Sequence, residues 1–192
     1  DVHGPYVVKG VRIGTPICED AWHADVAETL AETGAEILLI PNGSPYHRGK
    51  PNLRLNLMVS RVIETGLPLV YLNMVGGQDD QVFDGGSLGL NPGGALAWRV
   101  PVFEEAIAHL DFTRGPKGWQ AERAELEPLP DVWEQDYQAM VLSLRDYLAK
   151  SGIGKVILGL SGGIDSALVA AIASDAIGAA NVRCVMLPSD YT

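Results

Sequence analysis

A glycine-rich hexapeptide between an apolar run and a helical run constrains this chain of 192 residues more than any other feature. Ser161-Gly162-Gly163-Ile164-Asp165-Ser166 follows the apolar run 155–160 and opens an alanine-rich run that reaches about Ile177. The pattern predicts a strand, a tight turn and a helix. Because N–H groups at a helix N-terminus lack partners within the helix and the helix dipole favours negative charge, such a turn binds anions. Glycines let a phosphate approach the backbone, so the segment predicts a polyphosphate site.

The polar side chains of the hexapeptide suit the same ligand. The hydroxyls of Ser161 and Ser166 add donors, and Asp165 stands where a Mg²⁺ ion bound to a polyphosphate could be held.

Two other motifs compete for these residues. A Walker A loop needs a lysine after its glycines, and none follows here. A G-x-S-x-G nucleophile elbow matches 159–163, but it needs an acidic residue and then a histidine further along the chain. The last histidine is His109, so this alternative stays open only if the partner lies beyond Thr192. A glycine turn without a ligand is the third possibility.

The hexapeptide resembles the S-G-G-x-D-S pyrophosphate loop of the ATP-pyrophosphatase family. That resemblance implies cleavage of ATP between the α- and β-phosphates and adenylation of a substrate oxygen. It also implies the following ATP-binding residues: Gly159, Leu160, Ser161, Gly162, Gly163, Ile164, Asp165 and Ser166.

Composition excludes several classes of protein. The net charge of −10 argues against a broad nucleic-acid surface, which needs a basic face. No apolar run approaches the roughly 18 to 20 residues of a membrane span. Two cysteines cannot form a disulfide framework and fit a reducing cytoplasm. We expect the chain to be part of a longer polypeptide, because both of its ends fall close to predicted strands.

Hydrophobic periodicity predicts an α/β region followed by an antiparallel region, then a linker and a second α/β unit. The expected domains are 1–113 and 131–192, with a linker over 114–130, where glycines and prolines interrupt any period. Asp131 followed by Glu134 predicts a helix start, and Gly152 predicts its end. Predicted strands cover 11–17, 36–40, 67–73, 81–84, 86–90, 95–99, 155–160 and 182–187, and predicted helices cover 24–32, 51–65, 132–151 and 164–177.

Cys18 is a second candidate site. A lone cysteine is most often a small buried hydrophobe. This one ends a predicted strand and precedes a predicted helix, where N–H groups lower a thiol pKa, while its acidic neighbours Glu19 and Asp20 oppose that effect. The residues alone leave both interpretations open.

The surrounding motifs resemble the nitrilase superfamily, in the version found in the glutamine amidotransferase domain of glutamine-dependent NAD synthetases. The matching segments are Ile17-Cys18-Glu19-Asp20-Ala21-Trp22, 42–50, 73–79, 82–87 and 187–192. The implied fold is the C-terminal part of a nitrilase-like α-β-β-α sandwich, followed by the start of a Rossmann-like ATP-pyrophosphatase parallel sheet.

The resemblance also implies roles for residues. Cys18 attacks the side-chain amide of glutamine, giving a thioester and ammonia, and the backbone N–H of Glu19 helps hold the oxyanion. Ser44, Lys50 and Glu19 bind glutamine, with His47 and Arg48 as weaker candidates. The family's triad is Glu, Lys and Cys, with the Glu and Lys before the Cys. Before Cys18 this sequence has a single lysine, Lys9, and no glutamate. Lys9 does not sit in the family's lysine motif.

The function implied is that of a carbon-nitrogen ligase. ATP and Mg²⁺ activate nicotinic acid adenine dinucleotide, and ammonia from glutamine amidates it to NAD. The implied partners are these small molecules, with no nucleic acid and no membrane, and the implied assembly is a cytoplasmic homo-oligomer. Two alternatives remain: a nitrilase-type amidohydrolase without ligase activity, and a non-catalytic piece that keeps the fold.

Overall fold

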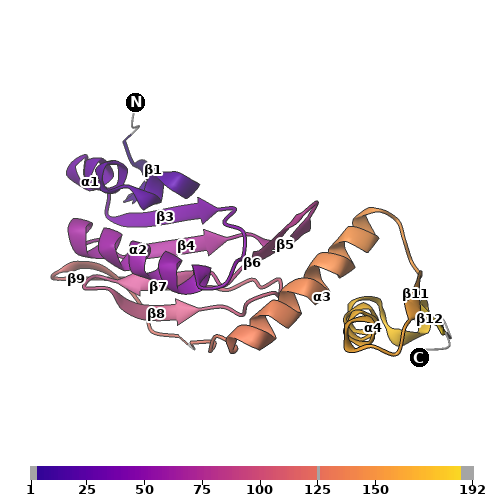
Figure 1. The fold of residues 1–192 in the computed structure, drawn as a ribbon. Coiled ribbons are helices and arrows are strands. Elements are labelled where there is room, and N and C mark those ends of the chain that lie inside the picture. The colour runs from indigo at the N-terminus through magenta and orange to yellow at the C-terminus, as the bar shows by residue number, and fades with distance from the viewer. Residues whose placement is uncertain (1–3, 125, 187–192) are drawn as a thin grey trace. The chain divides into compact units, whose positions relative to one another are not determined.

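The computed structural model describes residues 4–124 and 126–186, which divide into two compact units. The first unit takes its residues from 1–75 and 83–129, and the second from 76–82 and 130–192 (Figure 1). The expected C-terminal motif at 187–192 lies outside the described residues. Among the described helices, none is both long enough and apolar enough to cross a membrane.

A mixed six-stranded sheet forms the centre of the first unit. Its strand order is β1-β2-β3-β4-β7-β8, with parallel pairing from β2 to β4 and antiparallel pairing elsewhere. The strands are β1 (Tyr6–Val8), β2 (Val11–Gly14), β3 (Ile37–Asn42), β4 (Leu69–Asn73), β7 (Leu88–Asn91) and β8 (Ala95–Arg99). In the parallel part, the carboxyl ends of β2, β3 and β4 meet at one edge, where α/β sheets place their ligands.

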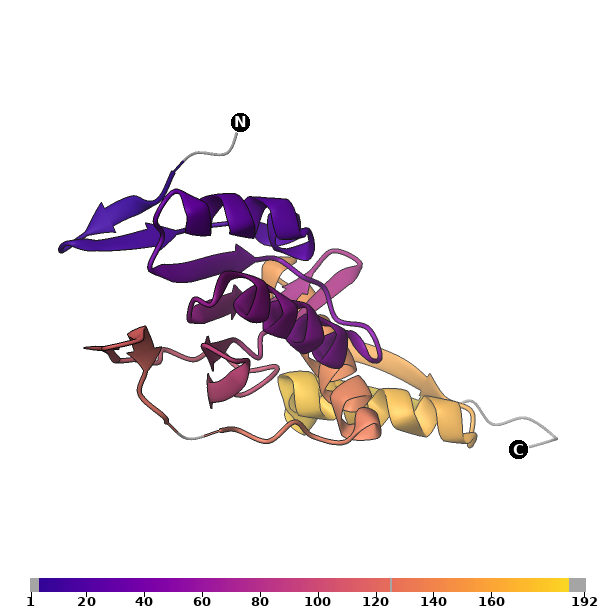
Figure 2. The same ribbon diagram turned by 90° about the vertical axis from the view of Figure 1, so that its left-hand side faces the viewer.

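Two helices, α1 (Ala24–Glu32) and α2 (Lys50–Thr65), pack on one face of this sheet (Figures 1 and 2). Helix α2 starts with Pro51 in its first turn and ends at Gly66, whose φ of +68° favours glycine. The core joins alternate residues of the strands to the inner faces of both helices. It contains Ala27, Leu30, Leu38, Ile40, Met58, Val62, Leu69, Tyr71, Leu88 and Leu90.

The opposite face of the sheet carries a smaller cluster around Trp98, which packs with Ala97 and Ala121. Ala121 belongs to a hairpin of β9 (Phe112–Gly115) and β10 (Gly118–Ala121). Two short strands thus occupy the first part of the predicted linker 114–130. The strands are only four residues long, too short to show a period, and burial of Ala121 against β8 stabilises them.

The second unit holds α3 (Val132–Lys150), β11 (Val156–Leu160), α4 (Ile164–Ile177) and β12 (Val182–Met186), with a short 3₁₀ turn at Ala179–Asn181. Strands β11 and β12 are parallel and joined through α4, so they form a β-α-β unit. As predicted, Asp131 caps α3, and its carboxylate accepts from the N–H groups of Trp133 and Glu134 at 2.8 and 3.0 Å.

The strands β5 (Val75–Gln78) and β6 (Gln81–Asp84) form a hairpin whose tip belongs to the second unit. The N–H of Gly77 donates to Asp146 of α3 at 2.7 Å, and Lys150 donates to the side chain of Gln78 at 2.9 Å. Polar contacts thus hold the hairpin tip against α3. Hydrophobic periodicity in the sequence does not predict such contacts.

The expected α/β class is confirmed, and most elements agree with the predicted ranges. Strand β2 is shorter than the predicted strand 11–17, because the chain leaves the sheet after Gly14 to form a 3₁₀ helix at Cys18–Trp22. Helix α3 buries Ala139, Leu142 and Leu148, whereas its large apolar side chains Trp133 and Tyr147 are exposed.

Adjacent residues of β3 provide a test of this packing. Leu38 is 0% exposed against both helices, whereas Leu39 points to the other face and is 37% exposed. Leu38→Ala should lower the free energy of unfolding by about 2–5 kcal/mol, because it leaves a cavity in the core. Leu39→Ala should cost clearly less. Urea unfolding of the full-length protein measures both, and equal losses would contradict the assigned faces.

Candidate functional site

Cys18 opens the 3₁₀ helix Cys18–Trp22, just beyond the carboxyl end of β2. Its φ of +52° lies in the left-handed region, which non-glycine residues rarely adopt. The Asp20 carboxylate accepts from the N–H of Ile17 at 3.0 Å, and the Asp20 N–H donates to the Ile17 carbonyl at 3.1 Å. These two bonds hold the turn around the strained cysteine, a conformation that is concentrated at active sites.

An open cavity of about 210 Å³ lies over Cys18. The residues that line it are Cys18, Glu19, Trp22, Gly43, Ser44, Pro45 and Lys50. The ammonium group of Lys50 lies 4.5 Å from the centre of the Trp22 ring, a cation–π contact that orients the lysine. The structure therefore brings together all four residues expected to act on glutamine: Cys18, Glu19, Ser44 and Lys50.

Other candidates lie apart from this cavity. Lys9 is in the exposed turn between β1 and β2 and is not among the lining residues. His47 and Arg48 are exposed and are not among them either. Apart from Cys18, the ionisable lining residues are Glu19 and Lys50, so the cavity offers a nucleophile and two charges of opposite sign.

Ser44 is held from below by Asn73, the last residue of β4. The Ser44 N–H donates to the side-chain oxygen of Asn73 at 3.0 Å, and the Asn73 side-chain nitrogen donates to the Ser44 carbonyl at 3.3 Å. Asn73 in turn donates to the carbonyl of Gly85 at 3.1 Å and approaches Asp84 at 3.5 Å. Buried polar contacts thus tie the Ser44 loop to the ends of β4 and β6.

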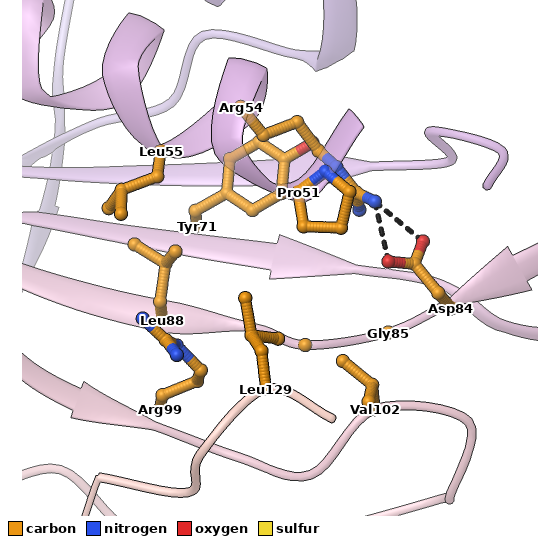
Figure 3. A pocket seen from close by; sticks show the side chains of 11 residues that line it. Pro51, Arg54, Leu55, Tyr71, Asp84, Gly85, Leu88, Arg99, Val102 and Leu129 are labelled. Carbon is orange, nitrogen blue, oxygen red and sulfur yellow. Dashed lines mark hydrogen bonds and ion pairs between the residues drawn. The ribbon is translucent and has the colours of Figure 1, made fainter. Parts of the chain in front are cut away.

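A buried ion pair lies beside this network. Nη2 of Arg54 donates to both carboxylate oxygens of Asp84 at 2.6 Å, and Figure 3 shows the two groups opposite each other, with the ring of Tyr71 nearby. Burial raises the pKa of Asp84, against the opposing effect of the Arg54 charge. Burial likewise raises the pKa of Tyr71. The adjoining cavity of about 20 Å³ has room for roughly one water molecule, not a substrate.

The second candidate site is the glycine turn between β11 and α4. Gly162 has a φ of +84°, and the Ser166 hydroxyl donates to the Gly163 carbonyl at 3.0 Å. The Ser161 hydroxyl lies 3.2 Å from that of Ser166 and accepts from the Gly163 N–H at 3.3 Å. The serines therefore shape the turn as well as offering donors. The turn is exposed at the carboxyl end of β11 and the N-terminus of α4, as predicted.

Asp165 lies in the first turn of α4 and is exposed. Within the described residues, no group of three or more His, Cys, Asp or Glu side chains could hold a metal ion. A single carboxylate still suits Mg²⁺, which is commonly bound by one or two carboxylates together with the phosphates of a substrate.

Sequence reasoning missed three residues of the first site. Trp22 and Asn73 lie in quoted motifs without an assigned role, and Arg54 was not singled out. One signal was available for Arg54. It shares the buried face of α2 with Met58 and Val62, and a charge at an apolar position of a helix requires a buried partner.

The family model described as carbon-nitrogen hydrolase matches residues 2–115, more than half of the chain. The chain belongs to this family. A second model, described as NAD synthase, matches residues 136–192. The expected succession of a nitrilase-type region and the start of an NAD synthase region is confirmed.

The chain is similar along its whole length to curated glutamine-dependent NAD(+) synthetases. It is 61% identical over 191 residues to the one from Rhodobacter capsulatus, covering 100% of this chain and 35% of the relative. The synthetase from Acinetobacter baylyi is 43% identical over 192 residues, with coverage of 99% and 35%. The chain thus spans about a third of the length of these relatives.

A solved structure agrees with this similarity. A glutamine-dependent NAD+ synthetase from Acinetobacter baumannii, in complex with ADP, matches with a TM-score of 0.91 and 41% identity. The match covers 98% of this chain and 35% of that one. A second synthetase, from Cytophaga hutchinsonii, matches with a TM-score of 0.65 and 29% identity over 90% of this chain and 26% of that one.

The buried ion pair yields a prediction. Arg54→Met should cost about 3–5 kcal/mol in the free energy of unfolding, because it leaves the Asp84 charge buried and unpaired. Arg54→Met combined with Asp84→Leu should recover most of that loss. Urea unfolding at pH 7 provides the comparison, and a double variant no better than the single one would contradict this account.

The Arg54→Met deficit should also depend on pH. Without Arg54, burial raises the pKa of Asp84 further, so the folded state keeps its proton to a higher pH than the unfolded state. The deficit should then be small near pH 4, close to the ordinary carboxyl pKa of about 3.9, and grow toward neutral pH.

Proposed function

We propose that this chain is part of a glutamine-dependent NAD synthetase. The observation that carries the proposal is the combination in one chain of a cysteine cavity of the carbon-nitrogen hydrolase family and a polyphosphate-type glycine turn in an NAD synthase region. A plain amidohydrolase would use the first feature alone.

At the first site, Cys18 attacks the side-chain amide carbon of glutamine. The C–N bond breaks, ammonia leaves, and water then hydrolyses the γ-glutamyl thioester to glutamate and the free thiol. The backbone N–H of Glu19 stabilises the oxyanion, while Ser44, Lys50 and Glu19 bind the polar groups of glutamine. Neither the general base nor the catalytic lysine of the family's triad is assigned to a residue that lines this cavity.

At the second site, residues 159–166 bind the phosphates of ATP. The carboxylate of nicotinic acid adenine dinucleotide attacks the α-phosphorus, and pyrophosphate leaves. Ammonia then displaces AMP from the acyl-adenylate to give NAD. The N–H groups at the start of α4 and the hydroxyls of Ser161 and Ser166 stabilise the charge that develops on the leaving pyrophosphate.

Asp165 would hold Mg²⁺ at this site. A carboxylate beside a polyphosphate repels it, and a bridging divalent cation turns that repulsion into attraction. When bound, the ion neutralises charge on the phosphate oxygens.

We also propose domain limits at 113 and 131, small-molecule substrates without nucleic acid or membrane partners, a cytoplasmic location and homo-oligomerisation, as the sequence leads us to expect.

Coupled turnover by the full-length protein tests the two sites separately. Cys18→Ala should lower glutamine-supported NAD formation by more than about a thousand-fold, since the nucleophile is lost, and should leave ammonia-supported formation intact. Asp165→Ala should lower both by roughly a hundred-fold or more. AMP release measured alongside NAD distinguishes a ligase from an amidohydrolase.

Each variant has a matched control. Cys184→Ala changes the other cysteine, which is exposed on β12, and Asp175→Ala changes a carboxylate in the last turn of α4. Both should retain glutamine- and ammonia-supported activity. Glutamine-supported turnover that survives Cys18→Ala would refute the role of Cys18. Glutamine hydrolysis without any ATP-dependent AMP release would favour the amidohydrolase, and no turnover of either kind would favour the non-catalytic alternative.

A further inference from the structure

The side-chain amide of Asn73 forms hydrogen bonds that hold the loop carrying Ser44. Its oxygen accepts from the Ser44 N–H, and its nitrogen donates to the carbonyls of Ser44 and Gly85. The side chain is only 6% exposed and is not among the residues that line the Cys18 cavity. Asn73 therefore has the geometry of a support and not of a ligand-binding group.

The residue that Asn73 supports is itself buried. Ser44 is 6% exposed and lines the Cys18 cavity. Its hydroxyl lies near that of Tyr71, yet among the described residues neither hydroxyl makes a hydrogen bond of good geometry. The Ser44 hydroxyl oxygen is itself fully buried, so it faces the interior beside Tyr71, and what Asn73 fixes at the cavity is the backbone of the Ser44 loop.

The support is itself anchored. The Asn73 N–H donates to the Ser87 hydroxyl at 2.9 Å, and its side-chain nitrogen approaches the Asp84 carboxylate, which Arg54 holds from α2. The position of Ser44 thus depends on contacts from β4, β6 and α2, all of them buried. Side chains locked in this way preorganise a site and reduce the cost of binding.

We propose that Asn73 is a positioning residue for glutamine binding, which holds the backbone of the Ser44 loop at the edge of the Cys18 cavity. This inference rests on the proposed glutaminase activity. Asn73 is the first residue of the segment 73–79. None of its described hydrogen bonds reaches Cys18, so we expect it to affect glutamine binding and not the chemical step.

The test uses the full-length protein and measures glutamine-supported and ammonia-supported NAD formation. Asn73→Asp keeps the shape and the acceptor but removes both donors and adds a charge next to Asp84. It should raise the KM for glutamine by about ten-fold, the loss of roughly one hydrogen bond, with kcat and ammonia-supported activity within about two-fold. If the aspartate variant fails to fold, Asn73→Thr replaces it. The threonine side chain is too short to reach Ser44, so the same rise in the KM for glutamine is expected.

Asn91 offers a matched control within the same unit. Its side chain also clamps one residue from both sides: its nitrogen donates to the Ala121 carbonyl at 2.9 Å, and its oxygen accepts from the Ala121 N–H at 2.7 Å. Asn91→Asp makes the same chemical change away from the Cys18 cavity, so the KM for glutamine should stay at the parent value.

The ammonia-supported reaction separates positioning from a general structural role, because it does not use the Cys18 cavity. An unchanged KM for glutamine, a fall in kcat alone or a parallel loss of ammonia-supported activity would each overturn the proposal. Absence of Cys18-dependent glutamine turnover in the parent protein would instead refute the proposed function.

Discussion

The buried pair of Arg54 and Asp84 is the interaction on which the first site depends. It joins α2, which begins with Lys50, to the end of β6, close to Asn73 and the Ser44 loop. Burying two charges costs several kcal/mol per ion unless they are well paired, so the pair tolerates little change in the distance between these elements. The walls of the Cys18 cavity are consequently fixed by a polar network placed within an otherwise apolar core.

The two candidate sites use different physics. The Cys18 cavity is open, and a strained backbone conformation presents the nucleophile beside preorganised side chains. The glycine turn is exposed and relies on backbone N–H groups, a helix N-terminus and two hydroxyls. A nucleophilic cysteine needs a cavity that orients its substrate, and the first unit provides it. A polyphosphate needs many oriented hydrogen-bond donors, and the second unit provides these.

Much of this arrangement could be predicted from sequence because local rules govern it. The helix at 24–32, the cap at Asp131 and the turn at 161–166 depend on neighbours within a few residues. The hairpin at 112–121 and the exposure of Trp133 could not, since both are decided by what packs against them. Asn73 stood in a recognisable motif, but its partners lie 29 and 12 residues away.

The sequence by itself determined the chemical groups: a cysteine after a strand, a glycine turn before a helix, and motifs that resemble two enzyme families. Only the tertiary structure decided that Ser44 and Lys50 share a cavity with Cys18, that Trp22 lies beneath Lys50, and that Asn73 supports Ser44. The reason is physical. Local propensity and turn chemistry act over a few residues, while a cavity exists only where separate strands and helices converge and bury their polar groups together.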